Sequence, residues 1–206
     1  MYTPGFNVVE DRATLLEAME RYSFAVLYGP GAEGRPVATH LPLVVEDDGP
    51  HGVLYGHFAR ANAHWRGLAG QETLVVFSGP HSYVTPALYE DRQSVPTWNY
   101  IAVHAYGELD LVEGEGEKDV LLEKLIAVTE PGFAQTWRGM PEKYRTGMLK
   151  GIVGFRIRIS RIEGKFKISQ NREAVERRNV QAAHAAGTDD QRALAEWMAR
   201  INGREK

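Results

Sequence analysis

Four short segments combine polar side chains with aromatic residues beside predicted strands, which is the pattern of a ligand pocket. They lie at 38–42, 56–65, 79–86 and 95–100. A flat-ringed mononucleotide needs cationic or hydroxyl groups for its phosphate, amide or backbone partners for the ring edge, and an apolar wall. The four segments contain all three kinds of group, so they predict a mononucleotide pocket.

Two cations are the candidates to neutralise the phosphate. Arg60 and Lys167 fill this role, because a guanidinium or ammonium group suits a doubly charged phosphate. Thr39, Asn62 and Ser82 add neutral donors. A surface ion pair is the alternative interpretation of Arg60.

The segment at 95–100 supplies the candidate wall for the ring. Trp98 and Tyr100 share one face of a predicted strand and Asn99 lies on the other. Trp98 is therefore expected to face the ring, while Asn99 braces the backbone or a second subunit. Core packing is the expectation for Tyr100.

His40 and Tyr83 complete the candidate cofactor-binding set, and both are testable as acid–base groups. His40 lies in an alternating strand, where it faces either the ligand or a structural partner. No residue is placed well enough by the sequence to be named as catalytic. His57 and Trp65 are interpreted as supports for the loop that carries Arg60.

Several common catalytic motifs are missing. The chain has no Gly-x-Gly-x-x-Gly after a strand, no phosphate loop and no Gly-x-Ser-x-Gly elbow. Seven histidines are present, but without His-Glu-x-x-His or clustered carboxylates we expect no metal site.

The first half of the chain is expected to be mostly antiparallel β-structure. A helix capped by Asp11 ends before Ser23. A short helix at 61–68 interrupts a series of predicted strands, at 24–28, 37–45, 53–57, 74–77 and 98–112. Short turns between these strands favour a barrel or sandwich over a Rossmann sheet.

The second half adds helices to this sheet. An amphipathic helix at 118–128 ends before Pro131, and strands follow at 151–159 and 164–168. Two further helices are expected, at 171–185 and 189–201. This organisation predicts one domain over 1–170 and a helical hairpin over 171–206, packed on that domain or on a partner subunit.

Composition restricts the compartment and the class of protein. The 206 residues suffice for one principal domain, and 43% of them are hydrophobic. The absence of cysteine excludes disulfides and fits a reducing compartment, so we expect a cytoplasmic protein. No signal sequence and no apolar run of about 20 residues is present, and we expect no membrane contact.

Charge is unevenly distributed along the chain. The net charge is −3, but residues 138–178 carry 12 Lys and Arg against 4 Asp and Glu. A solvated basic face is the simpler interpretation. DNA binding through residues 138–178 is the secondary hypothesis, with Arg156, Arg158, Arg161, Lys165 and Arg177 or Arg178 as its candidates.

The order of four motifs resembles the PaiB family of FMN-binding negative transcriptional regulators. They are Ala-Thr-His-Leu-Pro at 38–42, Gly-His-Phe-Ala-Arg-Ala-Asn at 56–62, Val-Pro-Thr-Trp-Asn-Tyr at 95–100 and Ser-Gln-Asn-Arg at 169–172. The resemblance implies an antiparallel FMN-binding split β-barrel with flanking helices. It also implies a homodimer with FMN as cofactor at the subunit interface.

Three functions remain open at this point. The resemblance implies a transcriptional regulator or flavin-linked sensor. A flavin-dependent reductase or oxidase and a haem-binding protein are the alternatives. Two departures from the family pattern, Ala63-His64 and Ala87-Leu88-Tyr89, lie beside the predicted pocket.

Overall fold

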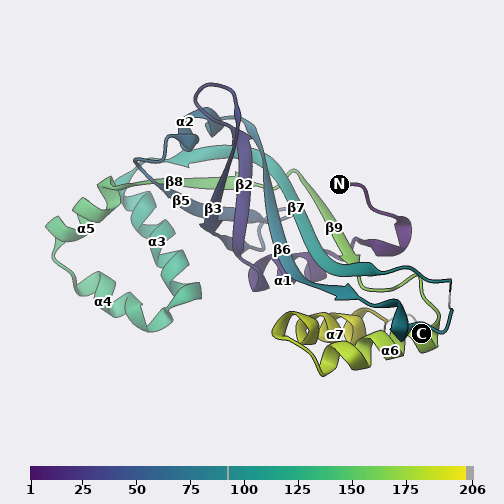
Figure 1. Ribbon diagram of the computed structural model, residues 1–206. Coiled ribbons are helices and arrows are strands. Elements are labelled where there is room, and N and C mark those ends of the chain that lie inside the picture. Colours follow the sequence, from purple (N-terminus) through teal and green to yellow (C-terminus); the bar gives the residue numbers. More distant parts are fainter. Residues whose placement is uncertain (92, 203–206) are drawn as a thin grey trace. The chain divides into compact units, whose positions relative to one another are not determined.

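The computed structural model describes residues 1–91 and 93–202. Figure 1 shows the chain, which divides into two compact units. Unit 1 comprises Met1–Asp11, Ser78–Val103 and the described part of Glu163–Lys206, and unit 2 comprises Arg12–Phe77 and His104–Ile162. The separation of 1–170 from 171–206 stays a prediction, and residues 203–206 of the predicted hairpin lie outside the described residues.

Unit 2 is built on antiparallel strand pairs. The strands of the sheet run in the order β3-β2-β6-β7-β8-β5-β4, so β3 and β4 form the two edges and the sheet does not close. Their bounds are β2 (Phe24–Pro30), β3 (Pro36–Pro42), β4 (Val44–Glu46), β5 (Val53–Ala59), β6 (Glu72–Val84), β7 (Thr97–Val112) and β8 (Ile152–Arg158). The strands predicted in the first half of the chain are therefore confirmed, except that the single strand predicted at 37–45 is two strands, β3 and β4, at opposite edges of the sheet. The part of β6 from Ser78 onward and the part of β7 up to Val103 belong to unit 1.

Alternation along these strands builds the core of unit 2. Leu27, Val75 and Phe77 are buried, and the rings of Phe58 and Phe155 lie 4.9 Å apart. Burial of each such side chain contributes about 1.5–3 kcal/mol. The helix α1 (Arg12–Arg21) begins after Asp11 as predicted and buries one apolar face, which comprises Leu15, Leu16, Ala18 and Met19.

A helical insertion separates β7 from β8. It consists of α3 (Glu115–Thr129), α4 (Ala134–Gly139) and α5 (Glu142–Lys150). The helix predicted at 118–128 is confirmed as α3, and its acidic first turn complements the helix dipole. Tertiary contacts hold α5, which was not predicted: Lys118 Nζ is buried and donates to the carbonyl of Leu149 over 2.7 Å.

Unit 1 contains the C-terminal helices. β1 (Val8–Val9) pairs with β9 (Arg161–Lys167), whose residues from Glu163 onward belong to this unit. Helices α6 (Ala174–Ala185) and α7 (Asp189–Asn202) confirm the two helices predicted there. The rings of Phe166 and Trp197 meet edge to face at 5.1 Å, so α7 packs on β9 within this unit.

Among the described residues the longest helix is α3, with 15 residues. The shorter helical elements are η1 (Gly5–Asn7), α2 (His64–Leu68), η2 (Pro86–Leu88) and η3 (Pro131–Phe133). Within residues 1–91 and 93–202, no helix has the length and apolarity needed to cross a membrane.

Strand β6 is much longer than predicted. The sequence predicts a strand only at 74–77. In the structure β6 continues through Gly79 and Pro80 to Val84. The segment at 81–84 is thereby a strand whose side chains alternate between exposed and buried.

Candidate functional site

The nine predicted cofactor residues fall into two groups, one in each unit. Thr39, His40, Arg60 and Asn62 belong to unit 2. The others belong to unit 1, and they are Ser82, Tyr83, Trp98, Asn99 and Lys167. Each group is described within its own unit.

Unit 1 presents three exposed aromatic residues, which we call the aromatic cluster: His81, Tyr83 and Trp98. Trp98 is 53% exposed and Tyr83 is 47% exposed, and their rings meet edge to face with centroids 6.1 Å apart. The ring of His81 lies 6.3 Å from that of Trp98. Large aromatic rings this exposed can pack against a flat ligand, which is what a ring-binding wall requires.

Lys167 lies beside this cluster and directs its ammonium group to the same strand. Its Nζ donates to the Thr97 hydroxyl and, over 2.7 Å, to the Trp98 carbonyl. Burial lowers the pKa of Lys167, and the nearby cations Lys165 and Arg172 lower it further. No carboxylate pairs with Lys167 within the described chain, so its ammonium group suits an anion.

Two other predicted residues of unit 1 serve its internal structure. Asn99 is 1% exposed, and its amide exchanges two hydrogen bonds with the Ser169 hydroxyl, of 3.0 and 3.2 Å. Ser169 has a φ of 67°, a left-handed backbone conformation that most residues avoid. The two hydrogen bonds between Asn99 and Ser169, which we call the Asn99–Ser169 clasp, hold this conformation in place. The Ser82 hydroxyl accepts from Gln191 Nε2 over 3.0 Å and thereby ties β6 to α7.

Unit 2 brings together three polar residues, which we call the Thr39 cluster: Thr39, Asn62 and His64. Thr39 Oγ1 and His64 Nδ1 lie 2.8 Å apart, and Asn62 Nδ2 donates to the same Oγ1 over 3.4 Å. Asn62 Oδ1 accepts from the backbone N–H of His64, 3.1 Å away, and so satisfies the first turn of α2. His64 is 3% exposed, and burial lowers its pKa while a hydrogen bond with the Gly29 backbone opposes that shift.

Sequence reasoning did not select His64 as a site residue. Its signal was the spacing Asn62-Ala63-His64 at the start of a short predicted helix, where an asparagine side chain commonly accepts from a backbone N–H two or three residues later. The alternation of side chains along β3 was a second signal, because it places Thr39 on the opposite face from Ala38 and His40. In the structure Thr39 is half-buried and both neighbours are exposed.

Arg60 is engaged by backbone carbonyls of unit 2. Its Nε donates to the Lys150 carbonyl over 2.7 Å and its Nη2 to the Ile152 carbonyl over 2.9 Å. The guanidinium thus bonds to the last carbonyl of α5, which lacks a helical partner, and to the first carbonyl of β8. His40 is exposed on β3 and stacks on Phe24 at 6.2 Å.

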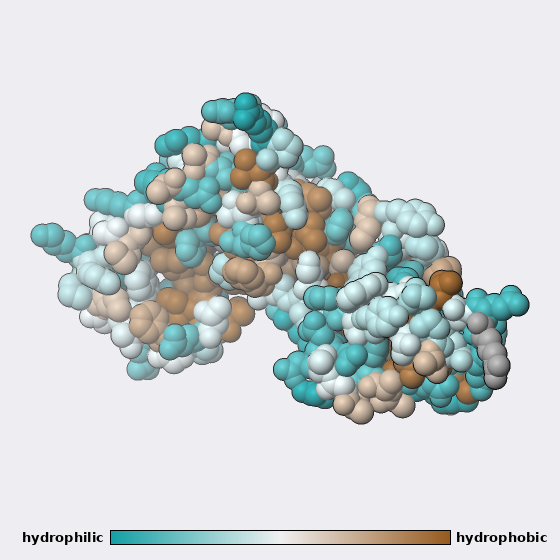
Figure 2. All heavy atoms as spheres, in the orientation of Figure 1, coloured by the Kyte–Doolittle hydropathy of each residue, from teal (hydrophilic) through white to brown (hydrophobic). Residues whose placement is uncertain are grey.

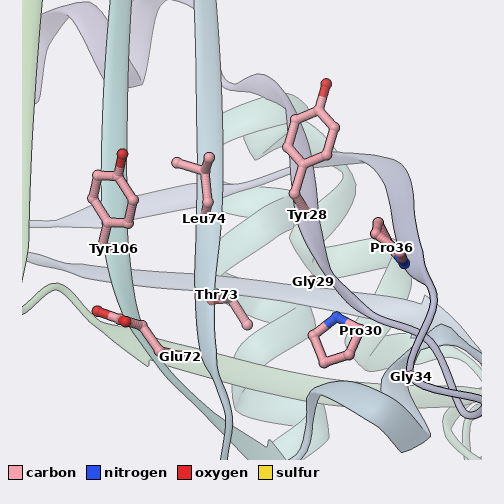
Figure 3. A pocket seen from close by; sticks show the side chains of 9 residues that line it. All are labelled: Tyr28, Gly29, Pro30, Gly34, Pro36, Glu72, Thr73, Leu74 and Tyr106. Atoms are coloured by element: carbon pink, nitrogen blue, oxygen red, sulfur yellow. The ribbon is translucent and has the colours of Figure 1, made fainter. Parts of the chain in front are cut away.

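A pocket of about 410 Å³ lies in unit 2 outside the predicted residues. Figure 3 shows Tyr28, Leu74 and Tyr106 standing side by side along three strands, with Pro30, Pro36 and Glu72 at its other walls. Sequence analysis missed this pocket, because its walls come from segments that are distant in the chain. The outward positions of alternating strands were the available signal.

The residues present fit a flavin mononucleotide. The aromatic cluster supplies a flat, exposed wall, and Lys167 supplies a cation that has no carboxylate partner among the described residues. In unit 2, the Thr39 cluster supplies uncharged hydrogen-bonding groups. Each unit, taken by itself, therefore holds groups of a kind that such a ligand requires.

Comparison with known proteins agrees with this chemistry. Residues 1–161 match the family model described as "Putative FMN-binding domain". The chain is 37% identical over 186 residues to "Protease synthase and sporulation protein PAI 2" of Bacillus subtilis, and the match covers 87% of each chain.

Solved structures share the fold at low sequence identity. The flavocytochrome Anf3 from Azotobacter vinelandii superposes with a TM-score of 0.63 at 18% identity, covering 78% of this chain and 69% of that one. The FAD and haem binding protein from Mycobacterium smegmatis gives a TM-score of 0.60 at 17% identity, covering 88% and 81%. The predicted antiparallel split β-barrel with flanking helices is confirmed. The chain belongs to the PaiB family of FMN-binding split-barrel proteins.

Proposed function

We propose that this flavin-binding protein is a cytoplasmic homodimer that acts as a transcriptional regulator, with flavin occupancy changing what the dimer contacts. The observation that carries the binding part is the exposed aromatic cluster beside Lys167. The regulatory part is supported by similarity to a protein named for protease synthesis and sporulation. Fold similarity alone does not distinguish a regulator from an enzyme.

In this proposal unit 1 contributes the groups that contact FMN. Trp98 and Tyr83 wall the isoalloxazine ring, and Lys167 binds the phosphate as a point charge. When bound, the flavin itself supplies redox chemistry, while the protein holds and orients it. Asn99, Ser82 and Arg60 act indirectly, because their polar groups already bond to the protein.

Paired ligands test this assignment. We expect Lys167→Met to weaken FMN binding by about tenfold, the loss of one charge-assisted bond, and to leave riboflavin, which has no phosphate, nearly unchanged. Trp98→Ala should weaken both ligands alike. Lys143→Met, on an exposed surface of α5, is the control. Equal losses of FMN and riboflavin with Lys167→Met would contradict the phosphate role.

The homodimer is supported by an exposed apolar face on unit 2, which we call the outer face. It is formed by the outward side chains of three adjacent strands: Phe24, Val26, Tyr28, His40, Leu74 and Val76. Phe24 is 66% exposed and Tyr28 is 42% exposed. Figure 2 shows hydrophobic residues gathered over β2 and β6. A second copy of this chain is the occupant we propose, with its side chains filling the pocket of Figure 3.

Sedimentation velocity tests the dimer. Phe24→Asp should shift wild-type dimers to monomers, because it places a charge in an apolar interface. Val120→Asp is the matched control, since Val120 is 55% exposed on α3 and lies outside the outer face. A wild-type monomer contradicts the homodimer, and a dimeric Phe24→Asp variant contradicts the outer face as its interface.

DNA contact is assigned in this proposal to the basic segment 138–178. Two of its arginines share one carboxylate: Arg156 Nε lies 3.2 Å and Arg158 Nη1 3.5 Å from Asp110 Oδ2. A phosphate therefore competes with Asp110 for both side chains. We expect Asp110→Asn to strengthen DNA binding and steepen its salt dependence, and Arg156→Ala with Arg158→Ala to weaken it.

Filter binding at low and physiological salt measures this effect. Absence of DNA binding by wild type and Asp110→Asn at low salt would contradict direct DNA contact. Steady NAD(P)H consumption by the FMN-loaded protein would instead favour the reductase alternative.

A further inference from the structure

Another pocket of unit 2, of about 240 Å³, lies between α3 and the face of the sheet that this helix contacts. We call it the α3 pocket. On the sheet side, Tyr55 of β5 pairs with Arg156 of β8, which pairs with Asp110 of β7. Residues directly opposite one another in antiparallel strands project to the same face, so these three side chains lie together there. Tyr55 and Arg156 line the pocket with residues of α3.

The body of the α3 pocket is apolar. Tyr55 and Val112 pack against the buried core beneath α3, in which Leu121 is 2% exposed. Val120 is 55% exposed, so it lies where the pocket opens to solvent. The volume is the share of about eight water molecules, at about 30 Å³ each. The pocket therefore suits a small molecule with one short apolar group.

Arg156 offers part of its guanidinium group to this pocket. Its Nε lies 3.2 Å from Asp110 Oδ2, so the carboxylate holds the side chain from one side. Its two Nη groups make no hydrogen bond with the described residues. Two N–H groups of a guanidinium can bind a carboxylate through parallel hydrogen bonds. Arg156 therefore favours a carboxylate on the ligand.

Two charged residues of α3 complete the lining, and they differ in how far they are paired. Lys124 Nζ bonds to Glu46 and lies 4.7 Å from the centre of the Tyr55 ring. Glu117 is exposed, and it makes no ion pair or hydrogen bond with any residue that the structure describes. An unpaired carboxylate beside an apolar pocket suits an ammonium group of the ligand.

A molecule that satisfies both groups carries a carboxylate, an ammonium group and an apolar side chain. We propose that the α3 pocket binds a free α-amino acid with an apolar side chain. Its carboxylate bonds to Arg156, its ammonium group bonds to Glu117, and its side chain packs against Tyr55. The site lies wholly within unit 2 and needs no flavin, so it stands or fails separately from the flavin site of unit 1.

Three ligands with the same branched carbon chain test these contacts. They are L-leucine, 4-methylpentanoate, which lacks the amine, and 3-methylbutylamine, which lacks the carboxylate. In ¹H–¹⁵N correlation spectra of the protein as purified, millimolar leucine should cause saturable shifts of the Tyr55 and Val120 amide signals. Each analogue should bind about tenfold more weakly, since it lacks one charged contact. An analogue that binds as tightly as leucine would overturn the proposal.

Two substitutions assign each end of the ligand. Glu117→Gln should weaken leucine binding about tenfold and leave 4-methylpentanoate within about twofold, because only leucine carries the ammonium group. Arg156→Met should weaken leucine equally and leave 3-methylbutylamine within about twofold. The titrations contain no DNA, because DNA contact is assigned to Arg156 as well. A variant that weakens leucine and its matched analogue by the same factor would contradict the contact proposed for that residue.

Filling the pocket tests its location. Val120→Trp places a bulky ring at the opening and should abolish the saturable shifts. Val128→Trp is the matched control, because Val128 is 60% exposed on the same helix and does not line the pocket. Leucine binding that survives Val120→Trp, or its absence in wild type, would overturn the proposal. Leucine binding by a protein that binds no FMN would contradict the proposed flavin site alone.

Discussion

The aromatic cluster of unit 1 and the Thr39 cluster of unit 2 differ in how far the protein uses each for its own structure. Trp98 and Tyr83 expose about half of their surface and contribute little to the core. Thr39, Asn62 and His64 bond to one another around a buried ring. An exposed aromatic ring can therefore contact a ligand directly. A polar side chain that already makes internal hydrogen bonds can offer a ligand only its remaining donors and acceptors.

The largest contrast is expected between two tryptophans of unit 1. Trp197 is 1% exposed and packs on Phe166, so Trp197→Ala should cost about 3–5 kcal/mol of unfolding free energy. Trp98→Ala should change stability by less than about 1 kcal/mol, because its ring is half exposed. Urea denaturation measures both. Comparable losses would show that the aromatic cluster is part of the core.

The Asn99–Ser169 clasp predicts the next largest effect. Asn99→Ala leaves the buried Ser169 hydroxyl without its partner, which should cost about 1–3 kcal/mol in urea unfolding. Riboflavin affinity, measured well below the unfolding temperature, should stay within about twofold of wild type, because Asn99 acts on the ligand only indirectly. A tenfold loss of affinity with intact stability would instead make Asn99 a ligand contact.

A third prediction tests whether Arg60 of unit 2 serves the internal structure or binds the phosphate. Arg60→Ala removes two hydrogen bonds, one to the last carbonyl of α5 and one to the first carbonyl of β8, and should cost about 1 kcal/mol, because the site is exposed. We expect the ratio of FMN to riboflavin affinity to stay unchanged, with Lys143→Ala as the control. A selective loss of FMN affinity would return Arg60 to the phosphate site.

The smallest effect is expected from pH. Burial lowers the pKa of His57, His64 and His184 in the folded protein, so the unfolded chain binds more protons as pH falls. Stability should therefore be fully present above about pH 6.5, the ordinary histidine value, and decline below it. Urea unfolding at pH 7.5 and 5.5 measures the decline, and His184→Gln should reduce it. His51→Gln is the control. If it reduces the decline in stability as much as His184→Gln does, burial of the histidine is not the cause.

Periodicity predicted most of the elements, because it reflects which face each segment buries. The alternation at 98–100 correctly separated the exposed Trp98 from the buried Asn99. The strand predicted at 74–77 was too short, since β6 extends from Glu72 through Gly79 and Pro80 to Val84. Helix α5 was missed, because its carbonyl end is held by Arg60 and Lys118 from distant parts of the chain.

By itself the sequence determined the family, the flavin ligand and the antiparallel, helix-flanked fold, because motif order and periodicity are properties of the chain. Only the tertiary structure decided which candidate groups are used internally. Asn99 meets Ser169 across 70 residues, and Arg60 reaches the Lys150 carbonyl across 90. Hydrogen bonds are short and directional, so the partners of a polar side chain depend on segments that only folding brings together.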